Sequence, residues 1–304
     1  MINRILSIHP LIEFFVRLVY LKFPFLNKLN TGRFIYKNSN YYNFDELFVR
    51  LDSMGVDKNG ILIIHSSYDN LKNCGLEPNQ IIDKLKDYIS PYGTLAMNAT
   101  RKFKRDNNGF LIYDTKKSRV NSGVIPAFFL KSMDVEVSSF PINSMVVYGR
   151  RAKEIVKNNL DCSNSSSCGD TSSWKFCMDN GAWVLGMGID LTHSLTIIHV
   201  LEESNHDLWP IKDWFESKKF KIITNGISKE VEVMDRREVW GKLHFAERTL
   251  AKDLIKKGII KVFYLGETRF ELLNSKELYH FLKSKNKNAY PYFFINRKYF
   301  KSHN

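Results

Sequence analysis

A threonine, a histidine and a glutamate follow one another at three-residue spacing near the middle of the chain. They are Thr196, His199 and Glu202. On a helix this spacing places the three side chains in one column, so that the carboxylate can hold the imidazole. An imidazole held by an acid can act as a general base. The spacing alone leaves open that His199 forms only a solvated ion pair with Glu202 or Glu203.

The elements before this segment would place it at the edge of a sheet. Residues 182–188 form an apolar run of strand length that closes with two glycines, and ligands often bind where such strands end. Upstream, helical patterns over 45–54 and 78–89 alternate with short apolar runs over 60–65 and 94–97. This alternation is typical of βαβ units in a parallel or mixed sheet.

The rest of the chain continues the α/β pattern with irregular interruptions. Residues 101–122 are polar and basic and show no periodicity, which predicts a long surface loop. The pair Asn225-Gly226 favours a two-residue turn and predicts a hairpin. Further expected elements are a helix over 123–130, a strand over 144–149, and helices near 242–257 and 274–283. We find no internal repeat or linker, so we predict one α/β domain over 43–304, with a mixed, mainly parallel β-sheet flanked by helices.

Composition sets limits on the class of protein. The chain has 304 residues, of which 44% are hydrophobic, as in globular proteins. Its four cysteines have no zinc-finger spacing and suit a reducing cytoplasm, and no metal site is predicted. The net charge of +13 favours polyanions such as nucleic acid, an anionic membrane face or phosphate-bearing small molecules. A nucleic-acid-binding protein is a competing interpretation, but no signature supports it, and we expect no nucleic-acid partner.

The N-terminal extension over 1–42 mixes apolar and charged residues. It contains no run of eighteen uncharged apolar residues that would predict a spanning helix. It also lacks the uncharged apolar stretch of a signal peptide. Residues 1–30 fit an amphipathic helix that packs on the protein itself, in a homodimer, or on a membrane surface. The expected location is the cytoplasm, with the inner membrane surface left open.

Several strings of the chain, taken in order, resemble the aminoglycoside 3-N-acetyltransferase family, whose members use acetyl-coenzyme A. The strings are Ile63-Ile-His-Ser-Ser67, Pro91-Tyr-Gly-Thr-Leu-Ala-Met97, Tyr113-Asp114 with Ser118-Arg119-Val120 and Gly123-Val-Ile-Pro126, Gly186-Met-Gly188 with Thr196-Ile-Ile-His199-Val-Leu-Glu202, Leu265-Gly-Glu-Thr-Arg269 and Tyr290-Pro-Tyr-Phe-Phe294. The resemblance covers about residues 43 to 294. The chain departs from the family pattern at Phe140-Pro141, Ser173-Trp174 and Met97-Asn98, where members usually carry His-Pro, Ser-Pro and Met-Pro.

The resemblance implies direct transfer of an acetyl group from acetyl-CoA to an amine, without an acyl-enzyme and without a metal. His199 would be the general base, Glu202 would orient it, and Thr196 would belong to the same catalytic group. The implied acetyl-CoA-binding residues are His65, Ser66, Ser67, Thr94, Lys117, Ser118, Arg119 and Val120. With Lys116, the basic members of that set would clamp the phosphates of the coenzyme. The implied acceptor-binding residues are Asp235 and Asp114.

The charge of the chain bears on the acceptor. Aminoglycosides are polycations, whereas this chain is basic and places Arg236 and Arg237 beside Asp235. We therefore expect an anionic amino sugar, such as a nucleotide-linked sugar or a polysaccharide precursor, as the small-molecule acceptor. Acetylation of an aminoglycoside antibiotic is the alternative. A protein that binds coenzyme A without catalysis is a further alternative, and the retained Thr-x-x-His-x-x-Glu string argues against it.

Overall fold

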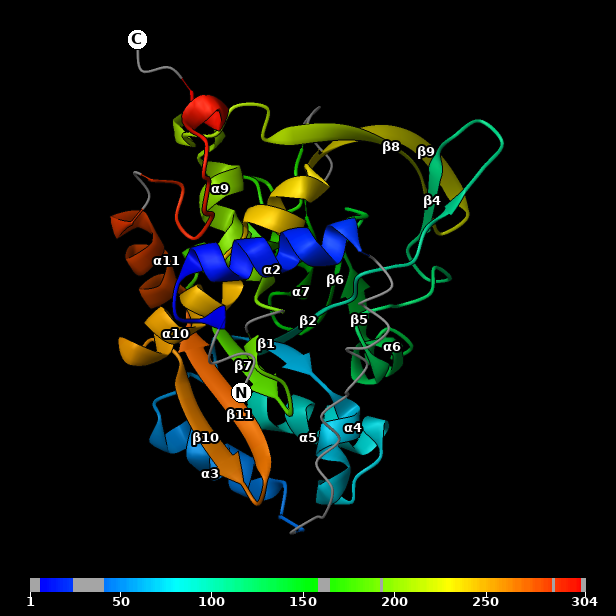
Figure 1. Ribbon diagram of the computed structural model, residues 1–304. Coiled ribbons are helices and arrows are strands. Elements are labelled where there is room, and N and C mark those ends of the chain that lie inside the picture. The colour runs from blue at the N-terminus through cyan, green and yellow to red at the C-terminus, as the bar shows by residue number, and fades with distance from the viewer. Residues whose placement is uncertain (1–5, 24–40, 158–164, 192–193, 286–287, 302–304) are drawn as a thin grey trace.

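The computed structural model describes residues 6–23, 41–157, 165–191, 194–285 and 288–301 (Figure 1). The rest of the predicted N-terminal extension, residues 1–5 and 24–40, lies outside the described residues. The main element is a seven-stranded sheet with the order β10-β11-β7-β1-β2-β6-β5. Its strands are β1 (Ile61–Ser66), β2 (Thr94–Asn98), β5 (Val135–Val137), β6 (Met145–Gly149), β7 (Trp183–Met187), β10 (Lys261–Leu265) and β11 (Thr268–Asn274).

The predicted mixed α/β fold is confirmed, but the sheet is not mainly parallel. Only the central strands β7, β1 and β2 run parallel to one another. The pairs β10–β11, β11–β7, β2–β6 and β5–β6 are all antiparallel. The connection between β10 and β11 shows the physical reason: Leu265 pairs with Thr268 across two residues, and so short a turn can join only antiparallel strands.

Helices cover both faces of this sheet. All six residues of β1 are buried, and successive side chains point to opposite faces. Leu62 and Ile64 pack in one core and Ile61 and Ile63 in the other. The first core contains α3 (Asp45–Ser53), α5 (Pro78–Ile89) and α6 (Val124–Phe129). The second contains α7 (Ala152–Val156), α8 (Ser173–Asp179), α10 (Glu247–Lys256) and α11 (Ser275–Ser284). Burial on both faces explains why β1 is a continuous apolar run in the sequence.

Most predicted elements agree with the structure to within one or two residues. The predicted helix over 78–89 coincides with α5, where Pro78 begins the helix and Glu77 and Gln80 form a capping box. The predicted helix near 242–257 is wrong in its first part. A π-helical turn, η6 (Trp240–His244), comes first, and α10 begins only at Glu247. An isolated β-bridge between Phe245 and Tyr292 separates the two.

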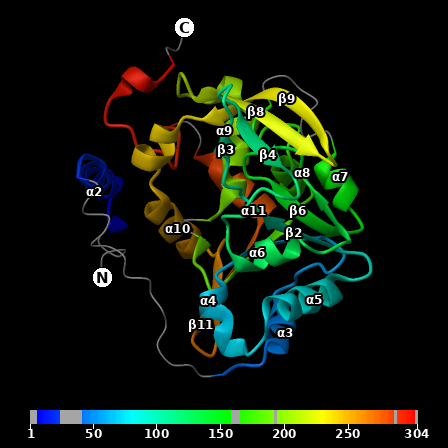
Figure 2. The same ribbon diagram turned by 90° about the vertical axis from the view of Figure 1, so that its right-hand side faces the viewer.

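A second, smaller sheet was only partly predicted. It has the order β3-β4-β8-β9, with β3 (Lys104–Arg105), β4 (Leu111–Asp114), β8 (Phe215–Thr224) and β9 (Ile227–Arg236). The predicted hairpin turn is confirmed, because Asn225 and Gly226 both have positive φ angles, of 50° and 83°. The prediction of a loop over 101–122 is wrong in part, since β4 pairs with β8. Its partner strand lies about a hundred residues downstream, so no local pattern reveals the pairing. Figure 2 shows this sheet at one end of the molecule.

The N-terminal helix α2 (Pro10–Lys22) packs on the protein itself. Its Phe14 ring lies 5.4 Å from the ring of His244 in η6. From α10, Arg248 donates to Glu13 of α2, and Lys252 donates to the carbonyl of Ser7, which precedes the helix. Figures 1 and 2 both show α2 beside α10. Within the described residues, every helix is too short or too polar to cross a bilayer.

Candidate active site

The histidine and the glutamate of the predicted column meet in the structure. Thr196 and His199 lie in a 3₁₀ turn, η4 (Thr196–His199), that continues into α9 (Val200–Ser204). His199 Nδ1 lies 2.7 Å from Glu202 Oε1. The Glu202 side chain is 3% exposed, so this pair is shielded from water and is not a solvated ion pair. The carboxylate thereby holds the imidazole in one orientation.

The neighbouring glutamate has a different partner. Glu203 accepts a hydrogen bond from the backbone N–H of Cys168 at 2.7 Å and faces away from His199 into the protein. Burial first, and then the charge of Glu202, raise the pKa of Glu203 to about 8. Of the two candidates, Glu202 is therefore the partner of the imidazole.

Two residues distant in sequence complete this cluster. Arg236, the last residue of β9, places Nη1 2.9 Å from Glu202 Oε1 and 2.7 Å from His199 Nδ1. Tyr292 donates its hydroxyl to Glu202 Oε1 at 2.8 Å and also contacts Arg236. From the sequence, Arg236 was expected only as a charge beside Asp235, and Tyr292 had no predicted role. The resemblance to the Tyr290–Phe294 string was the only signal that pointed to Tyr292.

The environment keeps the imidazole of His199 neutral. Burial lowers its pKa, the charge of Arg236 lowers it further, and Glu202 opposes this shift without reversing it. In the tautomer whose Nδ1 donates its proton to Glu202 Oε1, Nε2 carries the lone pair that a base requires. His199 thus has the protonation state of a general base at neutral pH.

Thr196 is held by Asn98 at the end of β2. Asn98 Oδ1 accepts hydrogen bonds from the backbone N–H and the hydroxyl of Thr100, at 3.1 and 2.9 Å. The amide nitrogen therefore points to Thr196 Oγ1, 3.0 Å away. Because Thr196 Oγ1 accepts this bond, its own hydrogen is left to donate, and the Ser194 carbonyl is a distant acceptor at 3.4 Å.

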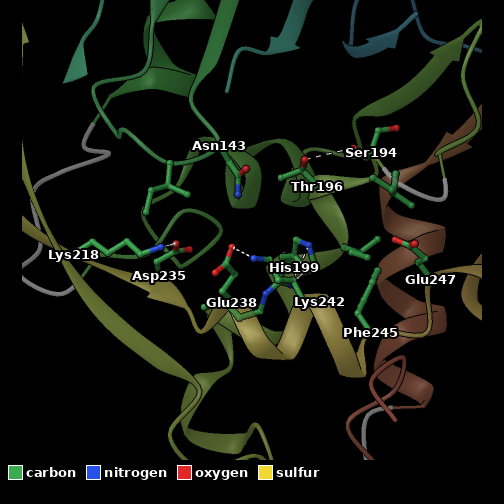
Figure 3. Close-up of a pocket in the computed structure, with 15 residues that line it drawn as sticks. Asn143, Ser194, Thr196, His199, Lys218, Asp235, Glu238, Lys242, Phe245 and Glu247 are labelled. Atoms are coloured by element: carbon green, nitrogen blue, oxygen red, sulfur yellow. Dashed lines mark hydrogen bonds and ion pairs between the residues drawn. The ribbon is translucent and has the colours of Figure 1, made fainter. Parts of the chain in front are cut away.

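A cavity of about 460 Å³ adjoins His199 (Figure 3). Its wall carries both charges: Asp235, Glu238 and Glu247, and Lys218, Arg236 and Lys242. Asp235, one of the predicted acceptor residues, lies here and is 2.5 Å from Lys218. The remaining lining residues are Ile142, Asn143, Ser194, Leu195, Thr196, Ile198, Gly241 and Phe245. We call this cavity the acceptor cleft.

A second cavity, of about 520 Å³, lies beside α6 and contains all three residues of the predicted phosphate clamp. Lys117, Ser118, Arg119 and Val120 line it together with Lys116. Lys131 adds a further cation. Among the described residues that line it there is no carboxylate, so this cavity suits an anionic ligand. We call it the basic cavity.

Asp114, predicted to bind the acceptor, has a structural role instead. Its Oδ1 accepts hydrogen bonds from the backbone N–H groups of Lys116 and Lys117, each at 2.9 Å. This arrangement is a turn cap. Asp114 lines neither cavity, so it shapes the segment that carries the basic side chains.

Thr94, predicted to bind acetyl-CoA, is also placed elsewhere. It pairs with Ile61 at the start of β1, whereas His65 and Ser66 end that strand. At about 3.3 Å per residue, the two ends are roughly 15 Å apart. Thr94 is buried, and its hydroxyl accepts the backbone N–H of Arg151 at 3.1 Å. Its role is to anchor the chain after β6.

His65, Ser66 and Ser67 lie at the carboxyl end of the parallel strands but line neither cavity. Burial lowers the pKa of His65 to about 4, and its ring stacks on Trp174 with centroids 6.2 Å apart. Trp174 in turn donates its indole N–H to the Asn143 carbonyl at 2.9 Å. Trp174, which departs from the family's Ser-Pro pattern, thus packs between β1 and the wall of the acceptor cleft. No cluster of metal-ligating side chains occurs in the described part of the chain.

Several solved aminoglycoside acetyltransferases share this fold. The apoenzyme of aminoglycoside acetyltransferase AAC(3)-IVa is 21% identical, with a TM-score of 0.65 over 81% of this chain and 89% of the other. AAC-IIIb in a binary complex with CoASH is 18% identical, with a TM-score of 0.67 over 83% of this chain and all of the other. Sisomicin-bound AAC-VIa is 14% identical, with a TM-score of 0.66 over 81% of this chain and all of the other. No curated protein sequence matches the chain.

The class of protein is that of the acetyl-CoA-dependent N-acetyltransferases, which are acyltransferases. The profile of the aminoglycoside 3-N-acetyltransferase family matches residues 63–285, well over half of the chain. The chain therefore belongs to the aminoglycoside 3-N-acetyltransferase family, as the resemblance of its sequence strings predicted.

Proposed function

We propose that this N-acetyltransferase transfers the acetyl group of acetyl-CoA to an amine of an aminoglycoside, with His199 as the general base. The observation that carries the proposal is the His199–Glu202 pair, 2.7 Å apart, on the wall of the acceptor cleft. The acceptor is acetylated through its neutral amine, and a base that removes the amine proton contributes on the order of 10² to 10⁴ in rate.

The proton passes from the acceptor nitrogen to His199 as that nitrogen attacks the thioester carbonyl. A C–N bond forms, the C–S bond breaks, and the proton on His199 is then available to the departing thiolate. Glu202 stabilises the imidazolium that forms in between. Tyr292 and Arg236 hold Glu202 in place through the bonds described above.

Thr196 has the geometry to stabilise the carbonyl oxygen as negative charge develops on it. Its hydroxyl accepts from Asn98 at 3.0 Å, and the long bond that it donates to the Ser194 carbonyl, at 3.4 Å, leaves its hydrogen able to turn to that oxygen. A donor held in place before the reaction stabilises such an oxyanion without reorganisation. Asn98 is thus a positioning residue that fixes the polarity of Thr196.

The two cavities divide the substrates by charge. The basic cavity offers Lys116, Lys117, Arg119 and Lys131 to the phosphates of acetyl-CoA. The acceptor cleft offers carboxylates to the ammonium groups of an aminoglycoside. Direct transfer then requires that both substrates be bound together.

The anionic acceptor expected from the net charge is supported less well than the aminoglycoside. Three carboxylates, Asp235, Glu238 and Glu247, line the acceptor cleft. The chain carries a net charge of +13, but that charge does not concentrate in the cleft, where three basic side chains balance the three acids. The family likewise favours an aminoglycoside.

A thiol-release assay tests the proposal. The purified protein is incubated with acetyl-CoA and either gentamicin or a nucleotide-linked amino sugar, and mass spectrometry identifies the acetylated product. We expect acetylation of gentamicin and a loss of at least about a hundredfold in kcat for His199→Ala. Preference for the nucleotide-linked sugar would overturn the acceptor assignment, and near-normal turnover of the variant would remove His199 from the mechanism.

A further inference from the structure

Each carboxylate of the acceptor cleft has a cationic partner within the protein. Asp235 lies 2.5 Å from Lys218, and Glu238 lies 2.6 Å from Lys242. The nearest cation to Glu247 comes from outside the residues that the family profile matches: Arg17 Nη2 of helix α2 lies 2.7 Å from its Oε1. The family match begins at residue 63 and does not include α2.

Arg17 is held firmly in this position. Its Nη1 donates to the carbonyl of Gly241 at 2.9 Å, and Gly241 lies in the π-helical turn that lines the cleft. Its Nη2 is bound by Glu13 of the same helix at 2.9 Å. Glu13 is only 1% exposed, and Arg248 approaches Glu13 at 3.0 Å and Glu247 at 3.5 Å. The side chains of Arg17 and Glu247 are 15% and 16% exposed, so water screens their attraction less than that of a surface pair.

Among the described side chains of this cluster, the formal charges cancel. Glu13 and Glu247 supply two negative charges, and Arg17 and Arg248 supply two positive charges. Without Arg17 the cluster would keep one unbalanced negative charge at the wall of the acceptor cleft. That charge would attract an additional ammonium group of the acceptor.

We propose that α2 is a specificity element of the acceptor site, in which Arg17 neutralises Glu247 and so limits the positive charge that the cleft prefers in an acceptor. This inference rests on the proposed function. Arg17 acts through Glu247 and does not itself touch the acceptor, so it is a positioning residue whose effect is electrostatic.

The test compares two aminoglycosides that differ by one charge. Neomycin B and paromomycin carry an amine and a hydroxyl, respectively, at a single position and are otherwise the same. We expect Arg17→Gln to raise the ratio of kcat/KM for neomycin B over paromomycin by about fivefold or more, because the cleft gains negative charge. Arg17→Lys keeps the charge and should keep the wild-type ratio. Glu247→Gln should lower the ratio, and it tests the same charge if Arg17→Gln does not fold.

Lys22→Gln is the matched control, because Lys22 is an exposed cation on the same helix. It should leave the ratio unchanged. An unchanged ratio in Arg17→Gln, or an equal change in Arg17→Lys, would overturn the inference while leaving the proposed function intact. If the wild-type protein acetylated neither these two compounds nor gentamicin, the proposed function would fail, and the ratio of the two calorimetric Kd values for the same variants would still decide the role of Arg17.

Discussion

Arg236 lies against the ring of His199, with Nη1 2.7 Å from Nδ1 and 3.1 Å from Nε2. A guanidinium this close disfavours a second positive charge on the imidazole. Burial is the larger cause of the lowered pKa of His199, and Arg236 is the next. The neutral imidazole therefore depends on two elements, because His199 comes from η4 and Arg236 from the end of β9.

Replacing Arg236 should move the pH dependence of the reaction. Arg236→Gln keeps a hydrogen-bond donor but removes the charge, so the pKa of His199 should rise. The base acts only when it is unprotonated, and the acid limb of the kcat profile should therefore move to higher pH, by about half a unit or more. The measurement is kcat from about pH 5 to about pH 9, the range in which imidazole groups titrate.

Arg237→Gln serves as the control for that profile. Arg237 is the next residue and is exposed, and its guanidinium donates to the Phe215 carbonyl at 3.3 Å. Its replacement should leave the limb in place. An acid limb that stays put or moves to lower pH in Arg236→Gln would show that Arg236 does not control the base.

The hydrogen bond from Asn98 to Thr196 predicts that reversing its direction lowers kcat. In Asn98→Asp a carboxylate faces Thr196 Oγ1 and accepts the hydrogen that the hydroxyl now presents. We expect kcat to fall by roughly tenfold or more, since the loss of one oxyanion donor lowers kcat by about 10² to 10³. The KM of the acceptor should change little. Steady-state kinetics with saturating acetyl-CoA provides both values.

Two further variants separate polarity from packing. Asn98→Ala removes the amide without reversing its polarity and should lower kcat less than Asn98→Asp. In a Thr196→Val background, Asn98→Asp should add little further loss, because the two changes act on one hydroxyl. Equal losses in Asn98→Ala and Asn98→Asp would argue against a donor role for Thr196.

The basic cavity predicts a salt-dependent contribution to acetyl-CoA affinity. Replacing Lys116, Lys117 and Arg119 together by glutamine should raise the Kd of acetyl-CoA at least about tenfold and flatten its dependence on ionic strength. Calorimetric titrations at two salt concentrations measure both effects. The control triple variant Lys256→Gln/Lys257→Gln/Lys261→Gln removes the same charge from an exposed surface. If both triple variants changed the Kd of acetyl-CoA and its salt dependence equally, the basic cavity would not be the phosphate-binding site.

The raised pKa of Glu203 predicts that the stability difference between Glu203→Gln and the wild type depends on pH. Folding raises its pKa from 4.5 to about 8, so the folded state holds a proton that the unfolded state has lost. Its contribution to stability therefore falls as pH rises from about 4.5 to about 8 and is constant above that. Glu203→Gln has no carboxyl at this position and does not lose this contribution to stability. Its free energy of unfolding relative to the wild type should grow by at most about 1.4 kcal/mol per pH unit in that range.

Urea unfolding at a series of pH values measures this difference. Glu46→Gln is the control, because Glu46 is exposed, and its difference from the wild type should not change with pH. A flat difference for Glu203→Gln would mean that the buried carboxyl is already ionised near neutral pH.

The sequence predicted those parts of the site that depend on local spacing. The His199–Glu202 pair follows from three-residue spacing within one helical segment, and the strands that end beside it follow from apolar runs. Arg236 and Tyr292 reach Glu202 from positions 34 and 90 residues away. Such contacts depend on how the two sheets are placed, which no local pattern specifies.

Two of the predicted site residues have structural roles of a common kind. Thr94 and Asp114 belong to strings that resemble the family, but both side chains bind backbone N–H groups, of Arg151 in one case and of Lys116 and Lys117 in the other. A string can therefore resemble a family because the fold requires it and not because the substrate does. Asn98 was noted only as a departure from the family pattern, and its bond to Thr196 spans 98 residues.

The β8–β9 hairpin connects the basic cavity to the acceptor cleft. Along one edge, β8 pairs with β4, whose chain runs directly into the basic cavity. Along the other, β9 ends at Asp235 and Arg236 in the acceptor cleft. A one-residue slip in either pairing would turn every side chain of the strand to the opposite face. New acceptor preferences are therefore expected to evolve by exchange of side chains near the base of this ribbon, whereas changes of length are tolerated only at its tip, Asn225-Gly226.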